Sequence, residues 1–298
     1  TMKKAQNMPY QSRTLGAEAW YRFKKNKLAL GALAIFILLA LMAITTIIID
    51  LVTNNSIYDK YVISQDLLQR LQPPSKEHIL GMDEFGRDIL LRIIWGTRYS
   101  LFMGAFAVLG ASVLGGIIGA VAGYYNMMDT LLMRIMDVFL AIPTTLLAVA
   151  IVAAMGPSLV NVVLAIAISQ TPTFARVIRA QVLTIKDQEF VEAARSAGAS
   201  DARIIFRYIV PNALSPMIVQ VTMGMASAIL SIAGLSLIGM GIQAPMPEWG
   251  AMLSNARTYI RDAWHITVMP GAAIMITILI LNIIGDGLRD ALDPRMKN

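Results

Sequence analysis

The residue types that most often carry chemistry are scarce in this sequence. It contains no cysteine, which excludes a thiolate metal site and a cysteine nucleophile, and its two histidines, His78 and His265, are far apart. It has no glycine-rich phosphate-binding loop that ends in Gly-Lys-Ser or Gly-Lys-Thr, and no set of residues that would activate a nucleophile. We therefore expect no catalytic residue and no metal site in this chain.

Two pairs of polar residues stand out inside long apolar stretches. Arg134 and Asp137 are three positions apart, so they share a helix face, and we expect them to form a local ion pair near one end of their stretch. Ser169 and Gln170, close to Pro172, are candidates for lining a path rather than for catalysis. No other charge falls in the middle of a stretch, which argues against a proton relay or an ion-driven pump.

These residues must be positioned by a scaffold that lies in a membrane. Hydrophobic residues make up 56% of the 298 residues and charged residues 15%, which is more apolar surface than a soluble fold can bury. A helix needs about 20 apolar residues to cross a bilayer, and lipid forces the spanning backbone into helices. The sequence predicts an all-α polytopic membrane protein with six transmembrane helices in the stretches 28–49, 101–125, 131–155, 159–175, 213–242 and 266–285.

The distribution of basic residues predicts the orientation. If the N-terminus is cytoplasmic, most of the 25 lysines and arginines fall in cytoplasmic segments, as the positive-inside rule requires. The C-terminus is then cytoplasmic too, and the net charge of +6 reflects topology rather than nucleic-acid binding. The predicted parts are a cytoplasmic amphipathic segment 1–27, a first transmembrane helix 28–52, an extracytoplasmic loop 53–98, a five-helix core 99–285 that contains a cytoplasmic loop 176–215, and a cytoplasmic tail 286–298.

Two patterns predict how helices lie or pack. Apolar residues recur at helical spacing between residues 15 and 23, among basic ones, which favours an amphipathic helix on the inner interface; the alternative is a flexible basic tail. Small residues recur every four positions in the second stretch, so they share one helix face: Ala107, Ala111, Gly115, Gly119 and Gly123. This face is either a subunit or pore-lining interface or an ordinary contact between helices of one chain.

The loop 176–215 is longer than a connection between two helices needs. Gly198 suits the left-handed end of a first short helix, and Ser200 is placed to cap a second one, 201–209, which Pro211 would end. Two short helices hinged at a glycine predict a docking element for a partner protein. The alternative is a surface-lying amphipathic hairpin that has no partner.

The same loop carries a family resemblance. Glu192, Ala193 and Ala194, followed after three residues by Gly198 and then by Pro211, resemble the EAA motif of bacterial ATP-binding-cassette importer permeases. Further segments match the dipeptide/oligopeptide/nickel permease family in the same order along the chain, and together they identify its C-type subunit: 80–88, Pro245, 249–253 and 285–294.

The resemblance implies the type I ABC importer permease fold and a multi-pass place in the bacterial cytoplasmic membrane. It implies a related B-type permease subunit as partner, two cytoplasmic ATPase subunits that dock on the EAA loops, and an extracytoplasmic substrate-binding protein. The chain itself would bind no cofactor, because ATP and magnesium belong to the ATPase subunits. The implied function is alternating-access import of di- and oligopeptides. The alternatives are a nickel-chelate or glutathione permease of the same family, or a membrane scaffold that does not transport.

The resemblance also assigns roles to residues of two segments. In the loop, Glu192 would contact the ATPase, Ala193 and Ala194 would let the helix sit deep in its groove, and Gly198 would provide the turn. In the segment 80–88 we expect an ordered element on the outer face near the binding protein, built from Gly81, Asp83, Gly86, Arg87 and Asp88. An equal alternative is structural capping, in which an aspartate closes a turn and another starts a helix.

Overall fold

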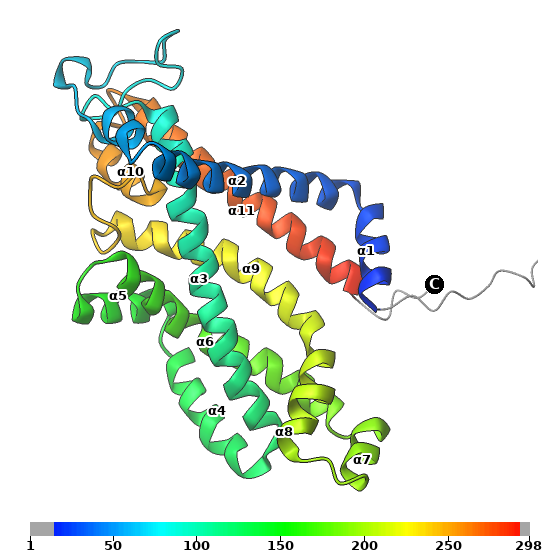
Figure 1. Cartoon of the computed structure of the whole chain (residues 1–298). Helices are drawn as coiled ribbons and strands as arrows, with labels where there is room; N and C mark the ends of the chain where they lie inside the picture. Colours follow the sequence, from blue (N-terminus) through cyan, green and yellow to red (C-terminus); the bar gives the residue numbers. More distant parts are fainter. Residues whose placement is uncertain (1–14, 293–298) are drawn as a thin grey trace, which may run out of the picture.

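The structure is a computed structural model, and it describes residues 15–292, whose regular elements are all helices (Figure 1). The segments 1–14 and 293–298, which hold the start of the predicted N-terminal segment and the end of the predicted tail, lie outside the described residues. Within the described range the one extended pairing is an isolated antiparallel bridge between Met82 and Asp88. The predicted all-α architecture is confirmed.

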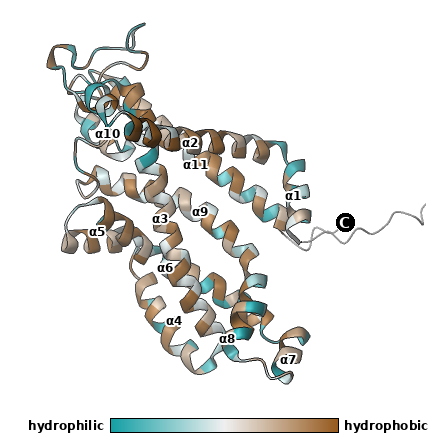
Figure 2. Cartoon of the chain, viewed as in Figure 1, coloured by the Kyte–Doolittle hydropathy of each residue, from teal (hydrophilic) through white to brown (hydrophobic). Residues whose placement is uncertain are grey.

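Five helical stretches are long and apolar enough to cross a membrane, or six if a bent pair counts as one span. Hydrophobic residues dominate α2 and α5, whereas hydrophilic residues gather at α1 and α8 (Figure 2). The spanning stretches are α2 (Lys27–Val52), α3 (Ile89–Tyr124), α6 (Leu159–Ile185), the continuous stretch Asp201–Leu237 that ends as α9 (Val210–Leu237), and α11 (Trp264–Leu292). Shorter elements lie between these stretches: η1 (Tyr58–Ile63), η2 (Leu67–Gln69), α10 (Trp249–Ala256) and η4 (Arg257–Tyr259).

The third predicted span is broken. Helix α4 (Asn126–Leu140) and helix α5 (Thr144–Met155) meet at an angle of 88°. Pro143 stands at the N-cap of α5, where its ring and its missing N–H end the preceding helix. The stretch 131–155 therefore consists of two half-helices that point in different directions.

Small residues let α3 approach α6 within one chain. A Cβ atom at Gly115 would lie 2.5 Å from the Cβ of Phe174, and one at Gly119 would lie 2.3 Å from the carbonyl oxygen of Ala175. Neither position has room for a side chain. The interpretation of this stripe as a subunit or pore-lining interface is wrong, and the alternative of packing within the chain is confirmed.

The N-terminal segment forms helix α1 (Leu15–Lys25), so a flexible tail is excluded for these residues. Phe23 is buried against α11, and Trp20 stacks on it with ring centroids 6.0 Å apart, while Trp20 and Tyr21 are both about half exposed. Asn26 then caps α2 by accepting a hydrogen bond from the N–H of Ala29 at 3.1 Å. The amphipathic helix expected here is confirmed, and α11 covers part of its apolar face.

The ion pair expected between Arg134 and Asp137 does not form. Asp137 instead accepts a hydrogen bond from Arg176 of α6 at 2.6 Å, and Arg134 is exposed without an ion pair inside residues 15–292. One turn along α6, Arg179 binds Asp129 through two parallel bonds of 2.5 and 2.6 Å. Because α4 runs beside α6, these guanidinium groups compete with a local pair that is worth only about 0.2–0.5 kcal/mol.

We predict that Gly119→Ala lowers the free energy of unfolding by about 1–3 kcal/mol, because the new methyl group meets the backbone of α6. Gly31→Ala is the matched control, since it lies in α2 and its Cβ would meet no atom within 4 Å. The control should be neutral or stabilise the protein by up to about 1 kcal/mol. Thermal unfolding of the purified proteins in detergent measures both effects, and equal melting temperatures would contradict the prediction.

Candidate functional site

The predicted cytoplasmic loop is shorter and more helical than expected. Its first part belongs to α6, which continues to Ile185. The remainder contains helix α7 (Glu189–Ser196), helix α8 (Asp201–Ile204) and the π-helical turn η3 (Ile205–Ile209), which leads directly into α9. These elements lie together at the C-terminal ends of α3 and α6, at the lower right of Figure 1.

Helix α7 has one face turned toward its own chain and another turned outward. Val191 is fully buried in an apolar cluster with Val182 of α6 and Ile204 of α8, and Ala194 is buried one turn further along. Glu192 and Ala193 are exposed. Of the two alanines expected to let the helix sit deep in a partner, only Ala193 faces outward, because the chain itself covers Ala194.

Gly198 ends α7 in the left-handed conformation, with φ at +79°. The N–H of Ala199 donates to the carbonyl of Ala194 at 3.1 Å, and the N–H of Gly198 donates to the carbonyl of Arg195 at 3.0 Å. This pair of bonds is the Schellman motif, which satisfies carbonyls at a helix end. A Cβ at Gly198 would meet no atom within 4 Å, so the backbone angle rather than lack of space requires glycine.

The second short helix departs from expectation at both ends. Ser200 stands at the N-cap of α8, but its side chain makes no capping hydrogen bond. Pro211 does not end the helix, because it lies in the first turn of α9, where a missing N–H is tolerated. The wide turn of η3, in which the N–H of Val210 bonds to the carbonyl of Ile205, joins α8 to α9 without a break.

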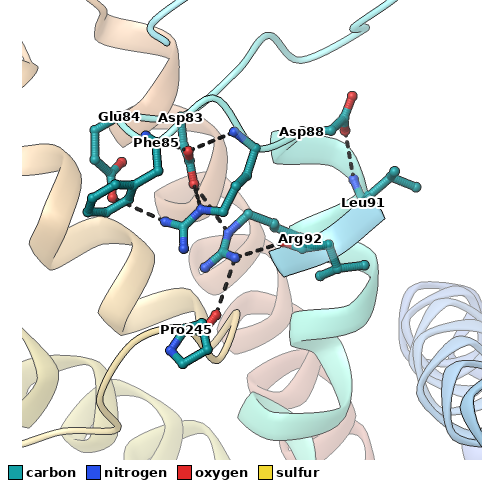
Figure 3. A network of polar contacts seen from close by, with 9 residues as sticks. Asp83, Glu84, Phe85, Asp88, Leu91, Arg92 and Pro245 are labelled. Atoms are coloured by element: carbon teal, nitrogen blue, oxygen red, sulfur yellow. Dashed lines mark hydrogen bonds and ion pairs between the residues drawn. The ribbon is translucent and has the colours of Figure 1, made fainter. Parts of the chain in front are cut away.

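The segment 80–88, predicted to lie on the outer face, is organised around a buried carboxylate (Figure 3). One oxygen of Asp83 accepts the N–H groups of Phe85 and Arg87, both at 2.9 Å, and the other accepts the Arg87 guanidinium at 2.7 Å. Arg87 is only 2% exposed, so its side chain is not offered to a partner on the outside. Burial, followed by the charge of Asp83, raises the pKa of the adjacent Glu84.

The other residues of this segment fix the backbone. Asp88 starts α3 by accepting the N–H of Leu91 at 2.9 Å. Gly81 and Gly86 have φ angles of +79° and +68°, and a Cβ at Gly86 would lie 1.8 Å from the carbonyl oxygen of Asp66. The structure therefore gives each of these residues a capping or turn-forming role.

Two further buried charged residues, Arg92 and Glu248, were not singled out from the sequence. Arg92 is buried and donates to the carbonyls of Val62 and Pro245 at 3.0 and 3.3 Å. Glu248 is also buried and caps α10 by accepting the N–H groups of Gly250 and Ala251, both at 2.8 Å. In the sequence, Arg92 is visible only as a charge inside an apolar run. Its partners Val62 and Pro245 lie 30 and 153 positions away, and such distant contacts cannot be inferred from neighbouring residues.

The two candidates for lining a path are buried inside the chain. Ser169 is 2% exposed and donates its hydroxyl to the carbonyl of Ala165 at 2.6 Å, and Gln170 is 9% exposed. Both side chains are buried among the helices of this chain, and their role in lining a path stays a prediction. A cavity of about 380 Å³ lies nearby between α6, α9 and α11, and Gln220 and Arg289 contribute polar groups to its wall. Among residues 15–292 no three acidic or histidine side chains are grouped to hold a metal ion.

The comparison with known families decides the class of protein. The family described as binding-protein-dependent transport system inner membrane component matches residues 111–298, and the N-terminal TM domain of oligopeptide transport permease C matches residues 14–74. The chain belongs to this permease family. It is a multi-pass protein of the bacterial cytoplasmic membrane and a subunit of an ABC importer, as the motifs predicted.

Curated relatives cover nearly the whole permease. The dipeptide transport system permease protein DppC of Alkalihalophilus pseudofirmus is 48% identical over 285 residues, 94% of this chain and 90% of the relative. The di/tripeptide permease DppC of Pseudomonas aeruginosa is 43% identical over 94% of this chain and 92% of its own length. The glutathione permease GsiD of Pectobacterium atrosepticum is 43% identical over 96% and 93%.

Solved structures share the fold. The inward-facing MetNI methionine ABC transporter matches with a TM-score of 0.57 at 17% identity, over 69% of this chain and 98% of the matched chain. An amino acid ABC transporter crystallised with histidines matches with a TM-score of 0.51 at 18% identity, over 66% and 92%. These likenesses confirm the ABC importer permease fold.

We predict that Arg87→Ala destabilises the permease instead of selectively weakening a docking contact. Removing one partner of a buried ion pair costs about 3–5 kcal/mol, and the lower end is expected because Arg92 remains 3.4 Å from Asp83. Lys76→Ala, an exposed charge of the same loop, should change stability by less than about 0.5 kcal/mol. Thermal unfolding and membrane yield report the difference; a stable Arg87→Ala protein with reduced uptake would favour docking.

Proposed function

We propose that this chain is the C-type permease subunit of an ATP-driven peptide importer, and that it forms half of a path with alternating access. The observation that carries the proposal is the exposed face of α7, where Glu192 and Ala193 lie on a short helix fastened to its own chain from one side. A helix presented in this way suits a groove in a partner protein. Phe190 is the one large apolar side chain that α7 keeps exposed, so the outward face of this helix is mainly polar or small.

The proposed coupling is mechanical. A partner ATPase receives α7 in a groove, and Glu192 contacts that groove or a basic group on its rim. Because Val191 packs against α6 and α8, a displacement of α7 carries the inner ends of the spanning helices with it. Differential affinity of the ATPases for the two states of the permease then drives the change of access.

The proposal also names the other subunits of the complex. It comprises a related B-type permease subunit, two cytoplasmic ATPase subunits and an extracytoplasmic substrate-binding protein. ATP and magnesium are bound by the ATPase subunits, and this chain supplies neither a cofactor site nor a catalytic residue. Both termini lie on the cytoplasmic side, as the positive-inside rule requires.

Small peptides are the proposed substrates, because the relatives named above include a dipeptide and a di/tripeptide permease. A glutathione permease matches at similar identity, so glutathione, itself a small charged peptide, is the second candidate. A nickel chelate is less favoured, since His78 is paired with Asp88 at 2.9 Å and His265 is buried. No observation favours a scaffold that does not transport.

We predict that Gly198→Val leaves the permease inserted but weakens ATPase association and abolishes transport, because the positive φ costs a side chain about 1–2 kcal/mol. Gly239→Val is a closely matched control. Gly239 has a φ of +79°, an equally open surrounding and the same pair of bonds at a helix end, but it follows α9 at the end away from the docking loop. The control should carry a similar strain and still bind the ATPase.

A second pair of variants tests the charge. Glu192→Ala should weaken association by about 1.5–3 kcal/mol if the contact is desolvated, whereas Glu189→Ala on the same helix should change it less. Co-purification of the ATPase and uptake of a peptide panel that includes glutathione measure both effects. A variant that alters which peptides are taken up, while ATPase binding and turnover stay normal, would show that the loop is not a coupling element.

A further inference from the structure

Two tyrosines at the C-terminal end of α3 share one carboxylate of the docking loop. Tyr124 ends α3 and donates its hydroxyl to Oδ1 of Asp201 at 2.7 Å. Tyr125 stands at the N-cap of α4 and donates to Oδ2 of the same carboxylate at 3.2 Å. The two rings meet edge to face, with centroids 4.9 Å apart. The two carboxylate oxygens of Asp201 therefore accept from two consecutive residues at the corner between α3 and α4.

The same cluster also reaches α7. The Arg195 guanidinium donates to the Tyr124 hydroxyl at 3.5 Å and lies 5.9 Å from the centroid of its ring. Arg195 is three positions after Glu192, so it lies on the helix proposed to dock. Asp201 is the first residue of α8. The tyrosines consequently contact both short helices of the loop, one through an arginine and the other through a carboxylate.

Apolar packing leaves α4 without such a connection. The cluster beneath the loop joins α7, α8 and η3 to α3, α6 and the start of α9, and no residue of α4 belongs to it. Helix α4 is fastened to α6 by ion pairs, and it leads into the bend of 88° before α5. The hydrogen bond from Tyr125, which stands between α3 and α4, is therefore a direct polar contact from α8 to the start of this broken span. Lys186, the residue after α6, makes a second contact by donating to Asn126 at 2.9 Å.

We propose that Tyr124, Tyr125 and Asp201 form a clasp that passes displacement of the docking loop to the corner between α3 and α4. They are positioning residues, and they set how much transport each hydrolysed ATP produces. The inference rests on the proposed function, because it requires α7 to be moved by an ATPase. In the absence of the clasp, α7 and α8 still pack on α6, but their movement reaches α4 only indirectly.

The test uses the complete complex in liposomes and measures peptide uptake and ATP hydrolysis together. Tyr124→Phe combined with Tyr125→Phe removes both hydroxyl groups while keeping both rings. We expect the ATPase to remain bound and the peptide transported per ATP to fall about two- to tenfold, the range that corresponds to the loss of modest hydrogen bonds. Tyr208→Phe is the matched control, because Tyr208 belongs to the same loop and its hydroxyl has no hydrogen bond among residues 15–292.

A second variant distinguishes loss of coupling from loss of the folded structure. Asp201→Asn keeps an acceptor oxygen for one tyrosine, so its transport per ATP should fall between the wild type and the double variant. A merely structural role would lower uptake, hydrolysis and melting temperature together and leave the ratio unchanged, and that result overturns the clasp. Failure of the wild-type permease to retain an ATPase overturns the proposed function, and the clasp with it.

Discussion

The close approach of α3 to α6 is the contact on which the rest of the molecule depends. It requires that Gly115 and Gly119 carry no side chain, since a Cβ at either position would reach the facing helix at 2.5 Å or less. Helix α3 has 36 residues, so it extends from the segment 80–88 to the docking loop as one rod of about 54 Å. Its N-terminal end carries Arg92 and its C-terminal end carries Tyr124. Because the glycine contact holds α3 against α6, the polar groups at the two ends of α3 keep a fixed position relative to each other.

Two ion pairs of the molecule differ in how their charges are solvated. The pair of Asp83 and Arg87 is buried, and every atom of such a pair must be satisfied before burial becomes tolerable. The pair of Asp137 and Arg176 is about half exposed, and pairs of that kind are worth about 0–1 kcal/mol. A buried set of contacts resists rearrangement because each intermediate leaves a charge unpaired. An exposed pair can separate and form again in water. The pair of Asp137 and Arg176 can therefore separate at lower cost than the pair of Asp83 and Arg87.

Sequence reasoning succeeded where the deciding interactions are local. Apolar length identified the spanning stretches, and the left-handed turn at Gly198 and the start of α3 at Asp88 followed from neighbouring residues. It failed where the partner lies far along the chain. Asp137 binds an arginine 39 positions away instead of its neighbour, and Ser169 is buried by the packing of other helices. The bend at Pro143 is an intermediate case, because the proline was visible but an apolar stretch of sufficient length concealed its effect.

The glycines of this chain separate two physical requirements that a sequence cannot tell apart. At Gly86 a side chain would strike the chain itself, since a Cβ would lie 1.8 Å from a carbonyl oxygen. At Gly198 the backbone angle is equally unusual, but the space beside it is open. Its position beside α7, whose Glu192 is also exposed, leaves room for a second molecule to approach closely. An open left-handed turn next to an exposed, well-anchored helix is thus the arrangement expected of a surface whose complement is supplied by another subunit.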